Sequence, residues 1–178
     1  MSNWTLVEGT LSDGLPMRLF IGERDGLIAA ASLCDDVHTR TEDEFLWRFG
    51  APHSRNSSPA LEEAARQAAQ YFSGARTTFD LPLLFKGTDF QRRVWQQLRS
   101  IPFGRTISYG ELAEQIDAPA AFRAVGNANG RNCLPVFVPC HRVLAAGGKI
   151  GGFTGGLGLK KRLLAHEATV LNQPLTLS

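Results

Sequence analysis

The residues most capable of chemistry lie together in the segment VFVPCHRV, which covers positions 136–143. Cys140 is followed directly by His141 and Arg142, so a thiol, an imidazole base and a permanent cation are adjacent in sequence. A thiol reacts as its thiolate, which needs positive charge or a base nearby. The segment therefore predicts that Cys140 is a nucleophile, and the alternative is a buried, inert cysteine.

The approach of the base to the thiol depends on the local backbone. In an extended segment neighbouring side chains point to opposite faces, so His141 would reach Cys140 best through a bridging water unless the backbone turns at Pro139. We interpret Arg142 as positive surroundings for the thiol and not as a catalyst. A metal site at Cys140-His141 is a further alternative, but the sequence has no CxxC pattern or second histidine cluster to support it.

Glu167 is the candidate for the third group that orients the imidazole of such a pair. It lies in the helical pattern LGLKKRLLAHEA, where Lys160, Leu164 and Glu167 share one face. If Leu164 faces the core, Glu167 points inward at His141 and completes a carboxylate–imidazole–water–thiol relay. His166 falls on the opposite side of this helix, and we expect it to be exposed to solvent.

The elements that must position these groups divide into two halves, with a boundary predicted near Lys86-Gly87. The first half predicts α/β structure, because turn residues separate three strand-like segments and two helical patterns follow. We expect strands at 4–11, 17–22 and 27–33, a helix at 41–49 with a Thr41/Glu44 capping box, a polar loop at 51–58, a helix at 59–72 with Ser58 as N-cap, and an extended linker at 77–85.

The second half predicts mainly helices. Capping boxes at Thr88/Gln91 and Ser108/Glu111 begin two of them, and a short stop at 117–119 separates the second from a helix over 120–130. A helix, a tight break and a second helix in a basic domain form the outline of a helix-turn-helix unit. The segment 132–148 predicts a strand, a bend at Pro139-Cys140 and a second strand.

The predicted helix over 120–130 consists almost entirely of small residues, and Arg123 is its only long charged side chain. Small residues let a helix backbone approach another surface closely. That surface is either a neighbouring helix or a groove of DNA into which Arg123 projects. The pattern leaves both interpretations open.

Composition limits the class of protein. No apolar run reaches the length of about 18 residues that a membrane-spanning helix needs, and the N-terminus lacks a signal-peptide pattern. Three cysteines do not make a disulfide framework, which favours a reducing cytoplasm. Residues 1–86 hold 8 Lys/Arg against 12 Asp/Glu, whereas residues 87–178 hold 11 against 5. This split suggests that the basic half meets a polyanion such as nucleic acid.

Four motifs then identify a resemblance. They are ISYGELA at 107–113, RAVGNANGRN at 123–132, PCHRV at 139–143 and GGFTGGLGLKKRLLAHE at 151–167. In order and spacing they resemble the O6-alkylguanine-DNA alkyltransferases, also called methylated-DNA–protein-cysteine methyltransferases. The resemblance implies a ribonuclease H-like α/β N-terminal domain over 1–86 and, over 87–178, a mainly α DNA-binding alkyltransferase domain of winged-helix type with a helix-turn-helix.

The activity implied by the resemblance is direct DNA repair without a cofactor. A cytoplasmic monomer would bind double-stranded DNA through the minor groove, with cooperative binding left open, and flip out the alkylated base. Extruding a base costs a few kcal/mol, which an inserted side chain offsets in part. The alkyl group of O6-alkylguanine, and of O4-alkylthymine, would move irreversibly to the protein's own cysteine, so that each molecule reacts once.

The resemblance also assigns roles by position. Cys140 would be the acceptor, His141 the water-mediated base and Glu167 its orienting group, while Asn132 braces the loop before the thiol and Tyr109 rotates the nucleotide and protonates the departing guanine. Arg123 would fill the vacated stack. The remaining implied DNA contacts are Ala124, Gly126, Asn127, Ala128, Asn129 and Arg131. The base pocket would be formed by Phe153, Thr154, Lys160 and the carbonyl group of Val143, which reads the guanine amino group.

Some members of that family hold a structural zinc in the N-terminal domain. Here Cys34, His38 and His53 are the candidate ligands, and their spacing predicts no zinc. Two other functions remain: a turnover thiol hydrolase that uses Cys140, His141 and Glu167, and a DNA-lesion sensor without transfer. The hydrolase leaves the small-residue helix and the charge split unexplained, and the sensor does not need the cysteine.

Overall fold

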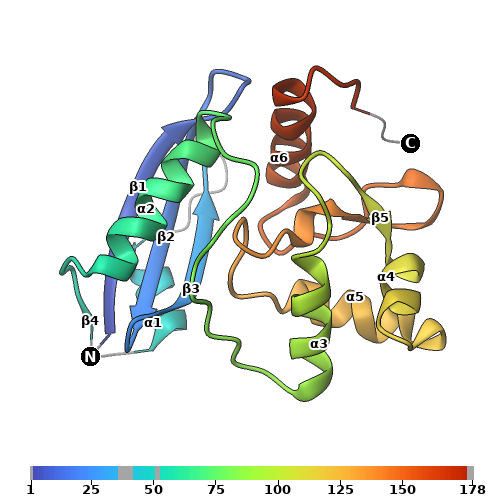
Figure 1. Cartoon of the computed structure of the whole chain (residues 1–178), viewed down its shortest axis with the longest axis horizontal. Coiled ribbons are helices and arrows are strands. Elements are labelled where there is room, and N and C mark those ends of the chain that lie inside the picture. The colour runs from blue at the N-terminus through green and yellow to red at the C-terminus, as the bar shows by residue number, and fades with distance from the viewer. Residues whose placement is uncertain (1, 36–41, 51–52, 176–178) are drawn as a thin grey trace. The chain divides into compact units, whose positions relative to one another are not determined.

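The computed structural model describes residues 2–35, 42–50 and 53–175 of the chain (Figure 1). The contacts between Cα atoms divide it into two compact units, Met1–Leu84 and Phe85–Ser178. The first is a four-stranded sheet with two helices, and the second consists mainly of helices. In the part of the chain that the structure describes, no helix is both long and apolar enough to cross a membrane.

The sheet of the first unit is mainly antiparallel. Strand β2 (Pro16–Arg24) pairs along its full length with β1 (Ser2–Thr10) and, through a register shift at Gly22/Glu23, with β3 (Leu27–Cys34). The β2–β3 turn places Asp25 and Gly26 at positive φ values of 53° and 80°, which glycine adopts without a steric penalty. The prediction of three strands separated by turns is confirmed.

The predicted loop over 51–58 is wrong in one detail. His53–Ser54 forms a short strand, β4, that pairs in parallel with Ser2 and Asn3 of β1 and completes the order β3-β2-β1-β4. Two residues carry no readable alternation, so the pattern could not reveal this strand. The helix predicted at 41–49 is α1 (Glu42–Phe49), and its proposed cap Thr41 lies outside the described residues.

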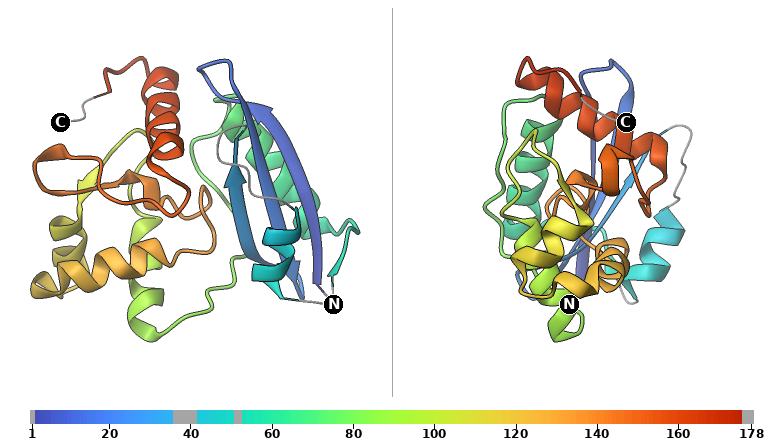
Figure 2. Two further views of the ribbon diagram at one scale, coloured as in Figure 1. Left: turned by 180° about the vertical axis from the view of Figure 1, so that it is seen from behind. Right: turned by 90° about the vertical axis from the view of Figure 1, so that its right-hand side faces the viewer.

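Helix α2 (Pro59–Phe72) lies along one face of the sheet (Figure 2). Ser58 caps it by accepting a hydrogen bond from the Leu61 backbone N–H at 3.2 Å, as predicted. The close packing depends on Gly9 of β1, where a Cβ atom would lie 2.6 Å from the Phe72 ring.

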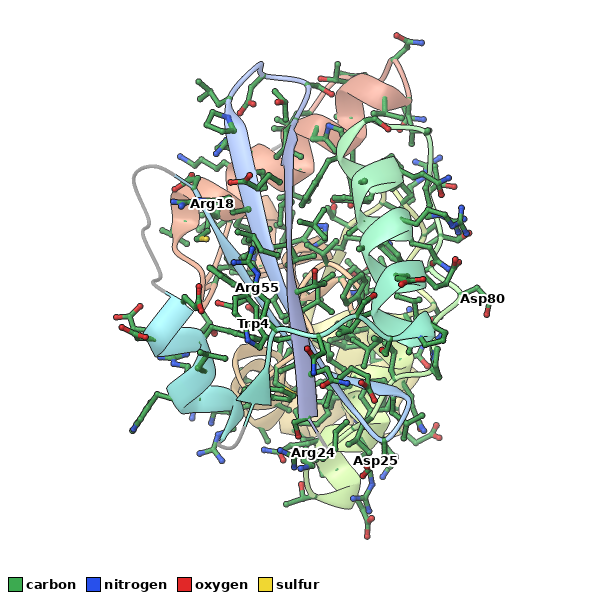
Figure 3. The ribbon with its side chains drawn as sticks, turned by 90° about the vertical axis from the view of Figure 1, so that its left-hand side faces the viewer. Trp4, Arg18, Arg24, Asp25, Arg55 and Asp80 are labelled. Atoms are coloured by element: carbon green, nitrogen blue, oxygen red, sulfur yellow. The ribbon has the colours of Figure 1, made fainter. Side chains whose placement is uncertain are left out.

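An aromatic cluster packs the other face of the sheet against α1. Trp4, Phe20 and Phe45 are at most 3% exposed and lie together with Cys34. The guanidinium group of Arg55 lies 5.1 Å from the Trp4 ring centroid and covers this cluster (Figure 3). Helices therefore pack on both faces of the sheet, and β2 and β3 are buried along most of their length.

The segment predicted as an extended linker runs beside β3. The Ile28 N–H donates to the Pro82 carbonyl at 2.8 Å, and the Leu84 N–H donates to the Ile28 carbonyl at 2.9 Å. Gln67 of α2 holds the preceding turn by exchanging two 2.9 Å hydrogen bonds with the backbone of Asp80. The extended conformation is confirmed.

The second unit, described up to residue 175, contains four α-helices and a two-stranded parallel sheet over that range. The helices are α3 (Asp89–Leu98), α4 (Tyr109–Gln115), α5 (Phe122–Gly130) and α6 (Leu157–Val170). The strands are β5 (Ile107–Ser108) and β6 (Val143–Leu144), and three 3₁₀ turns are η1 (Pro119–Ala121), η2 (Cys140–Arg142) and η3 (Ala146–Gly148).

Capping side chains mark where two helices of this unit begin, as the sequence predicts. Both capping boxes, Thr88/Gln91 on α3 and Ser108/Glu111 on α4, are present. The helix predicted over 120–130 begins only at Phe122, because Pro119–Ala121 forms the 3₁₀ turn η1. Helices α4 and α5 pack on each other across this break, which gives the helix–break–helix unit that the sequence predicts.

Three predictions for this unit are wrong. The segment 134–138 is a tight turn instead of a strand: Val136 has a φ of 75°, and the Val138 N–H donates to the Leu134 carbonyl at 2.8 Å. The second predicted strand shortens to β6. His166 is 2% exposed instead of solvent-exposed, because α6 is buried on more than one side.

Candidate active site

The backbone turns directly after Pro139 and places Cys140 at the start of a 3₁₀ turn. The Cys140 N–H donates to the Val138 carbonyl at 2.8 Å, and the Arg142 N–H donates to the Pro139 carbonyl at 3.0 Å. Cys140 is 5% exposed. Because η2 is not extended, the rule that neighbouring side chains face opposite directions does not hold here.

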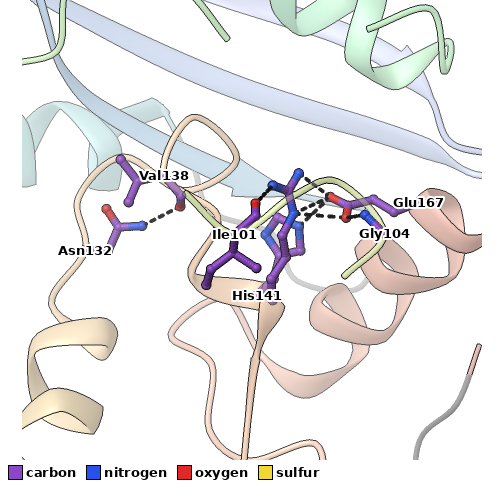
Figure 4. Close-up of polar contacts among 7 residues, drawn as sticks. Ile101, Gly104, Asn132, Val138, His141 and Glu167 are labelled. Carbon is purple, nitrogen blue, oxygen red and sulfur yellow. Dashed lines mark hydrogen bonds and ion pairs between the residues drawn. The ribbon is translucent and has the colours of Figure 1, made fainter. Parts of the chain in front are cut away.

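His141 and Glu167 are in direct contact inside the unit (Figure 4). The Nε2 atom of His141 lies 2.8 Å from Oε1 of Glu167, and both side chains are fully buried. An ionised carboxylate only accepts hydrogen bonds, so Nε2 carries the proton and Nδ1 presents its lone pair. Nδ1 is buried and has no hydrogen-bond partner among the described residues. The predicted pairing of Glu167 with His141 agrees with this geometry.

Arg142 holds the same carboxylate from another side. Its Nε lies 3.2 Å and 3.0 Å from the two oxygens of Glu167, its Nη2 lies 3.0 Å from Oε1, and its Nη1 donates to the Ile101 carbonyl at 2.6 Å. The Gly104 N–H completes the set by donating to Oε2 at 2.8 Å (Figure 4). The sequence interpretation missed this ion pair because it treated Arg142 as part of an extended segment.

These contacts determine the protonation states of the pair. Burial opposes ionisation of Glu167, but the hydrogen bond from His141 and the charge and hydrogen bonds of Arg142 outweigh it and hold the pKa of the carboxyl group well below its usual range. Burial lowers the pKa of His141 more than Glu167 raises it, and the positive charge of Arg142 adds to the lowering. At neutral pH the site therefore contains a carboxylate, a guanidinium and a neutral imidazole.

The Cys140 thiol lies in a mixed environment. Burial raises its pKa, whereas a hydrogen bond from the Asn132 side chain, the charge of Lys160 and the backbone N–H groups of Cys140 and His141 lower it, with burial the larger effect. The resting group is a thiol surrounded by donors that favour the thiolate. Such a group needs a base at the moment of reaction.

Asn132 also fixes the loop that leads to the thiol. Its Nδ2 donates to the Val138 carbonyl at 2.9 Å (Figure 4). Its Oδ1 accepts from the Leu134 N–H at 2.9 Å. This agrees with the predicted bracing role. These two bonds span the turn in which Val136 adopts its positive φ.

Lys160 lies in the interior as the donor to three carbonyl groups. Its Nζ lies 2.6 Å from the oxygen of Val143, 2.5 Å from that of Ile150 and 3.3 Å from that of Gly152. Burial lowers the pKa of Lys160 to about 8, although the nearby Cys140 raises it. The ammonium group therefore ties the loop after β6 to the active-site strand and already contacts the Val143 carbonyl that was predicted to read guanine.

Tyr109 begins α4 and reaches the same loop. Its hydroxyl donates to the Gly152 carbonyl at 3.4 Å. Burial and the Cys140 charge raise its pKa, and a hydrogen bond with Asn129 only partly opposes this. The phenol is therefore protonated at neutral pH and able to donate a proton.

Helix α5 presents only part of its predicted DNA-contact set. Arg123, Ala124, Asn127 and Arg131 are exposed and Gly126 is half-buried. Ala128 and Asn129, which the resemblance also assigns to DNA contacts, are 2% and 3% exposed, so their side chains are not on the exposed face of the helix. The Ala128 carbonyl accepts a 2.8 Å hydrogen bond from the Trp95 indole, and Asn129 donates to the Cys140 carbonyl at 3.3 Å. Ala128 therefore lies in the core beside Trp95, and Asn129 lies beside Cys140.

The last two predicted pocket residues lie at the end of the loop. Phe153 is half-buried, and Thr154 is exposed and donates to the Gly130 carbonyl at 2.6 Å. This bond ties the loop to the end of α5.

We compared the sequence and the structure with those of known proteins. The family model for the 6-O-methylguanine DNA methyltransferase, DNA binding domain, matches residues 89–169. A methylated-DNA–protein-cysteine methyltransferase of Mycolicibacterium paratuberculosis is 52% identical over 118 residues, which cover 66% of this chain and 72% of the relative. The chain belongs to the methylated-DNA–protein-cysteine methyltransferase family.

The likeness to this family extends beyond the segment with the site. The constitutive methyltransferase of Bacillus subtilis is 46% identical over 125 residues, 70% of this chain and 74% of the relative. A crystal structure of Mycobacterium tuberculosis OGT in complex with DNA is 36% identical, covers 94% of each chain and has a TM-score of 0.76. The methyltransferase architecture therefore includes the first unit, which lies outside the family model.

The zinc found in some family members was not expected here. Among the described residues, no group of three or more His, Cys, Asp or Glu side chains could hold a metal ion. Cys34 is fully buried in the sheet, with its thiol 3.7 Å from the Arg18 carbonyl. His38 and the side chain of His53 lie outside the described part of the chain.

Proposed function

We propose that Cys140 accepts the alkyl group of O6-alkylguanine, and of O4-alkylthymine, from duplex DNA in a single, irreversible transfer. The observation that carries this proposal is the buried His141–Glu167–Arg142 arrangement beside the thiol, with the Nδ1 lone pair of His141 unused. In the transfer, the bond between the alkyl carbon and O6 breaks and a bond between that carbon and Sγ forms. The thiol proton leaves toward His141, and the guanine oxygen departs with the electron pair of the broken bond.

His141 acts as the base in this proposal. It is neutral at rest and accepts the thiol proton on Nδ1, directly or through one water molecule. The imidazolium that results is stabilised by Glu167, whose ionised form Arg142 maintains. Arg142 is therefore a positioning residue, which holds the carboxylate in the orientation that fixes the imidazole tautomer.

Tyr109 supplies the opposite proton. Its raised pKa keeps the hydroxyl protonated, and its position on α4 beside the Gly152 carbonyl places it at the loop that closes the site. A proton given to the departing guanine avoids a buried anion as the leaving group. The thioether product has no base-labile bond, so the protein is consumed by one reaction.

DNA is the partner that the charge and shape of the second unit support. Arg123, Ala124 and Asn127 of α5 and Arg131 directly after it are exposed, and Ala124 lets the helix approach the minor groove closely. Arg123 enters the stack in place of the flipped base and offsets part of the unstacking cost of a few kcal/mol. We assign DNA binding and transfer to residues 87–178, of winged-helix type, and a ribonuclease H-like α/β domain to residues 1–86.

The conditions under which the protein works follow from the same proposal. A buried thiol that must stay reduced fits a cytoplasmic location. The protein acts on DNA as a monomer and needs no cofactor, because the thiol, the base and the proton donor come from its own side chains.

The two other candidate functions, a thiol hydrolase and a lesion sensor, explain fewer of the features of the site. A thiol hydrolase requires a water molecule to release the product from Cys140, but a thioether is not hydrolysed. A lesion sensor has no use for a base and a proton donor beside a cysteine.

Cys140→Ser is the variant that separates transfer from binding. We expect it to lose methyl transfer from duplex DNA that contains O6-methylguanine and to retain its affinity for that DNA. Cys133→Ser is the matched control, because Cys133 is a half-buried thiol of the same unit and should keep both properties. Parallel loss of transfer and binding in Cys140→Ser would show that the cysteine is structural.

A further inference from the structure

Phe122 is the first residue of α5 and directly precedes Arg123. Its aromatic side chain is 48% exposed, whereas Val125 of the same helix is fully buried. The guanidinium carbon of Arg123 lies 5.7 Å from the Phe122 ring centroid. In the protein without DNA, the side chain proposed to enter the base stack therefore rests on an exposed aromatic ring.

The same ring lines a surface pocket of about 770 Å³. Ile107, Tyr109, Leu144 and Ala145 form much of the remaining wall, which is mainly apolar. The charged residue of the wall is Glu111, whose carboxylate accepts from the Ser108 N–H at 2.6 Å in the α4 capping box. A phosphate group would meet this carboxylate, so the pocket fits an uncharged face such as deoxyribose or a base.

We propose that Phe122 is a further DNA-contacting residue of the site, which stacks on the nucleotide next to the flipped base once Arg123 has left its ring. This inference rests on the proposed function, and duplex DNA is its occupant because Tyr109, which is assigned to the flipped nucleotide, lines the same pocket, and Arg123 rests on the Phe122 ring at its wall. Apolar side chains of minor-groove proteins commonly wedge between base steps in this way. Phe122 thus has two successive partners, Arg123 before DNA binds and a nucleotide afterwards.

The affinity for lesion-containing duplex DNA tests this role. Stacking of a base on an aromatic side chain contributes about 1–3 kcal/mol, so Phe122→Ala should weaken binding roughly 5- to 150-fold. Phe122→Trp keeps a ring and should bind within a few-fold of the parent protein, while Phe122→Leu keeps only apolar volume and should behave like the alanine variant. Leu175→Ala, which truncates a 41% exposed side chain beyond α6, is the control and should bind normally.

The rate of transfer to Cys140 distinguishes the proposed role of Phe122 from the proposed function of the protein. Reaction with the free base O6-methylguanine needs no stacking, so Phe122→Ala should react with it at the parent rate. A fluorescent adenine analogue placed beside the lesion should report less unstacking with this variant than with the parent protein. If the parent methylates itself while Phe122→Ala binds and distorts the duplex normally, the Phe122 inference fails alone. If the parent does not methylate itself, the proposed function fails.

Discussion

Replacing Glu167 by Gln removes one charge from the centre of the site while keeping the shape of the side chain. Glu167 accepts hydrogen bonds from three groups that converge on it: the His141 imidazole at 2.8 Å, the Arg142 guanidinium at 3.0 Å and the Gly104 N–H at 2.8 Å. Glutamine can still accept from some of them. It cannot neutralise Arg142, which is 5% exposed.

The magnitude follows from this burial. Removing one partner of a buried ion pair costs about 3–5 kcal/mol because the other charge stays buried without compensation. That is a large part of the ~5–15 kcal/mol that stabilises a typical protein. The imidazolium formed during transfer also loses its carboxylate, so one to two pKa units of basicity, or roughly 10- to 100-fold in the rate of transfer, should disappear.

Urea denaturation followed by circular dichroism measures the first effect, and the rate of methyl transfer from duplex DNA measures the second. Glu63→Gln is the matched control, because Glu63 pairs with Arg66 at the surface and its loss should leave the midpoint unchanged. The double variant Arg142→Met/Glu167→Leu removes both buried charges and should recover much of the stability without recovering the rate. Parent-like stability and rate in Glu167→Gln would refute the reasoning.

Three further outcomes are expected. In the folded protein burial lowers the pKa of His141, whereas the contacts of Glu167 with His141 and Arg142 lower the pKa of Glu167 against the effect of burial, so the unfolded chain takes up protons that the native state excludes. The free energy of unfolding should therefore fall as pH drops below about 6.5 and again below about 4.5, and urea midpoints that stay flat over this range would contradict this expectation. Lys160→Met should slow transfer because it releases the Val143, Ile150 and Gly152 carbonyls. It should lower the urea midpoint only a little, because it also removes a buried cation whose pKa is lowered to about 8. A transfer rate equal to that of the parent protein in a stopped-flow assay would exclude this role. Arg123→Ala should reduce repair of duplex DNA far more than reaction with the free alkylated base, and equal losses in the two assays would remove its place in the stack.

Sequence reasoning succeeded where a local pattern determines a local structure. The hydroxyl groups of Ser58, Thr88 and Ser108 bond to backbone groups only three residues away, so each helix start could be read directly. The contact between Glu167 and His141 could also be predicted, because helical spacing places Glu167 on the same face as Leu164, and Leu164 is buried.

Sequence reasoning failed where tertiary contacts override the local conformational preference of the residues. The β-branched residues around Val136 favour a strand, but Asn132 bonds to both ends of the segment and stabilises a turn. The ion pair between Arg142 and Glu167 could not be predicted without the 3₁₀ turn over Cys140–Arg142. Only such a non-extended segment directs both His141 and Arg142 at α6. Ala128 and Asn129 belong to the predicted DNA helix, but a list of small residues does not reveal which side of the helix packs on Trp95.

The intact mass of the protein after incubation with excess duplex DNA that contains O6-methylguanine tests the central claim most directly. The account predicts a gain of one methyl group per molecule, located on Cys140 by peptide mapping, with no further gain when fresh DNA is added. Unmodified protein, a methyl group on Cys133 or Cys34, or repair of more lesions than there are protein molecules would contradict it.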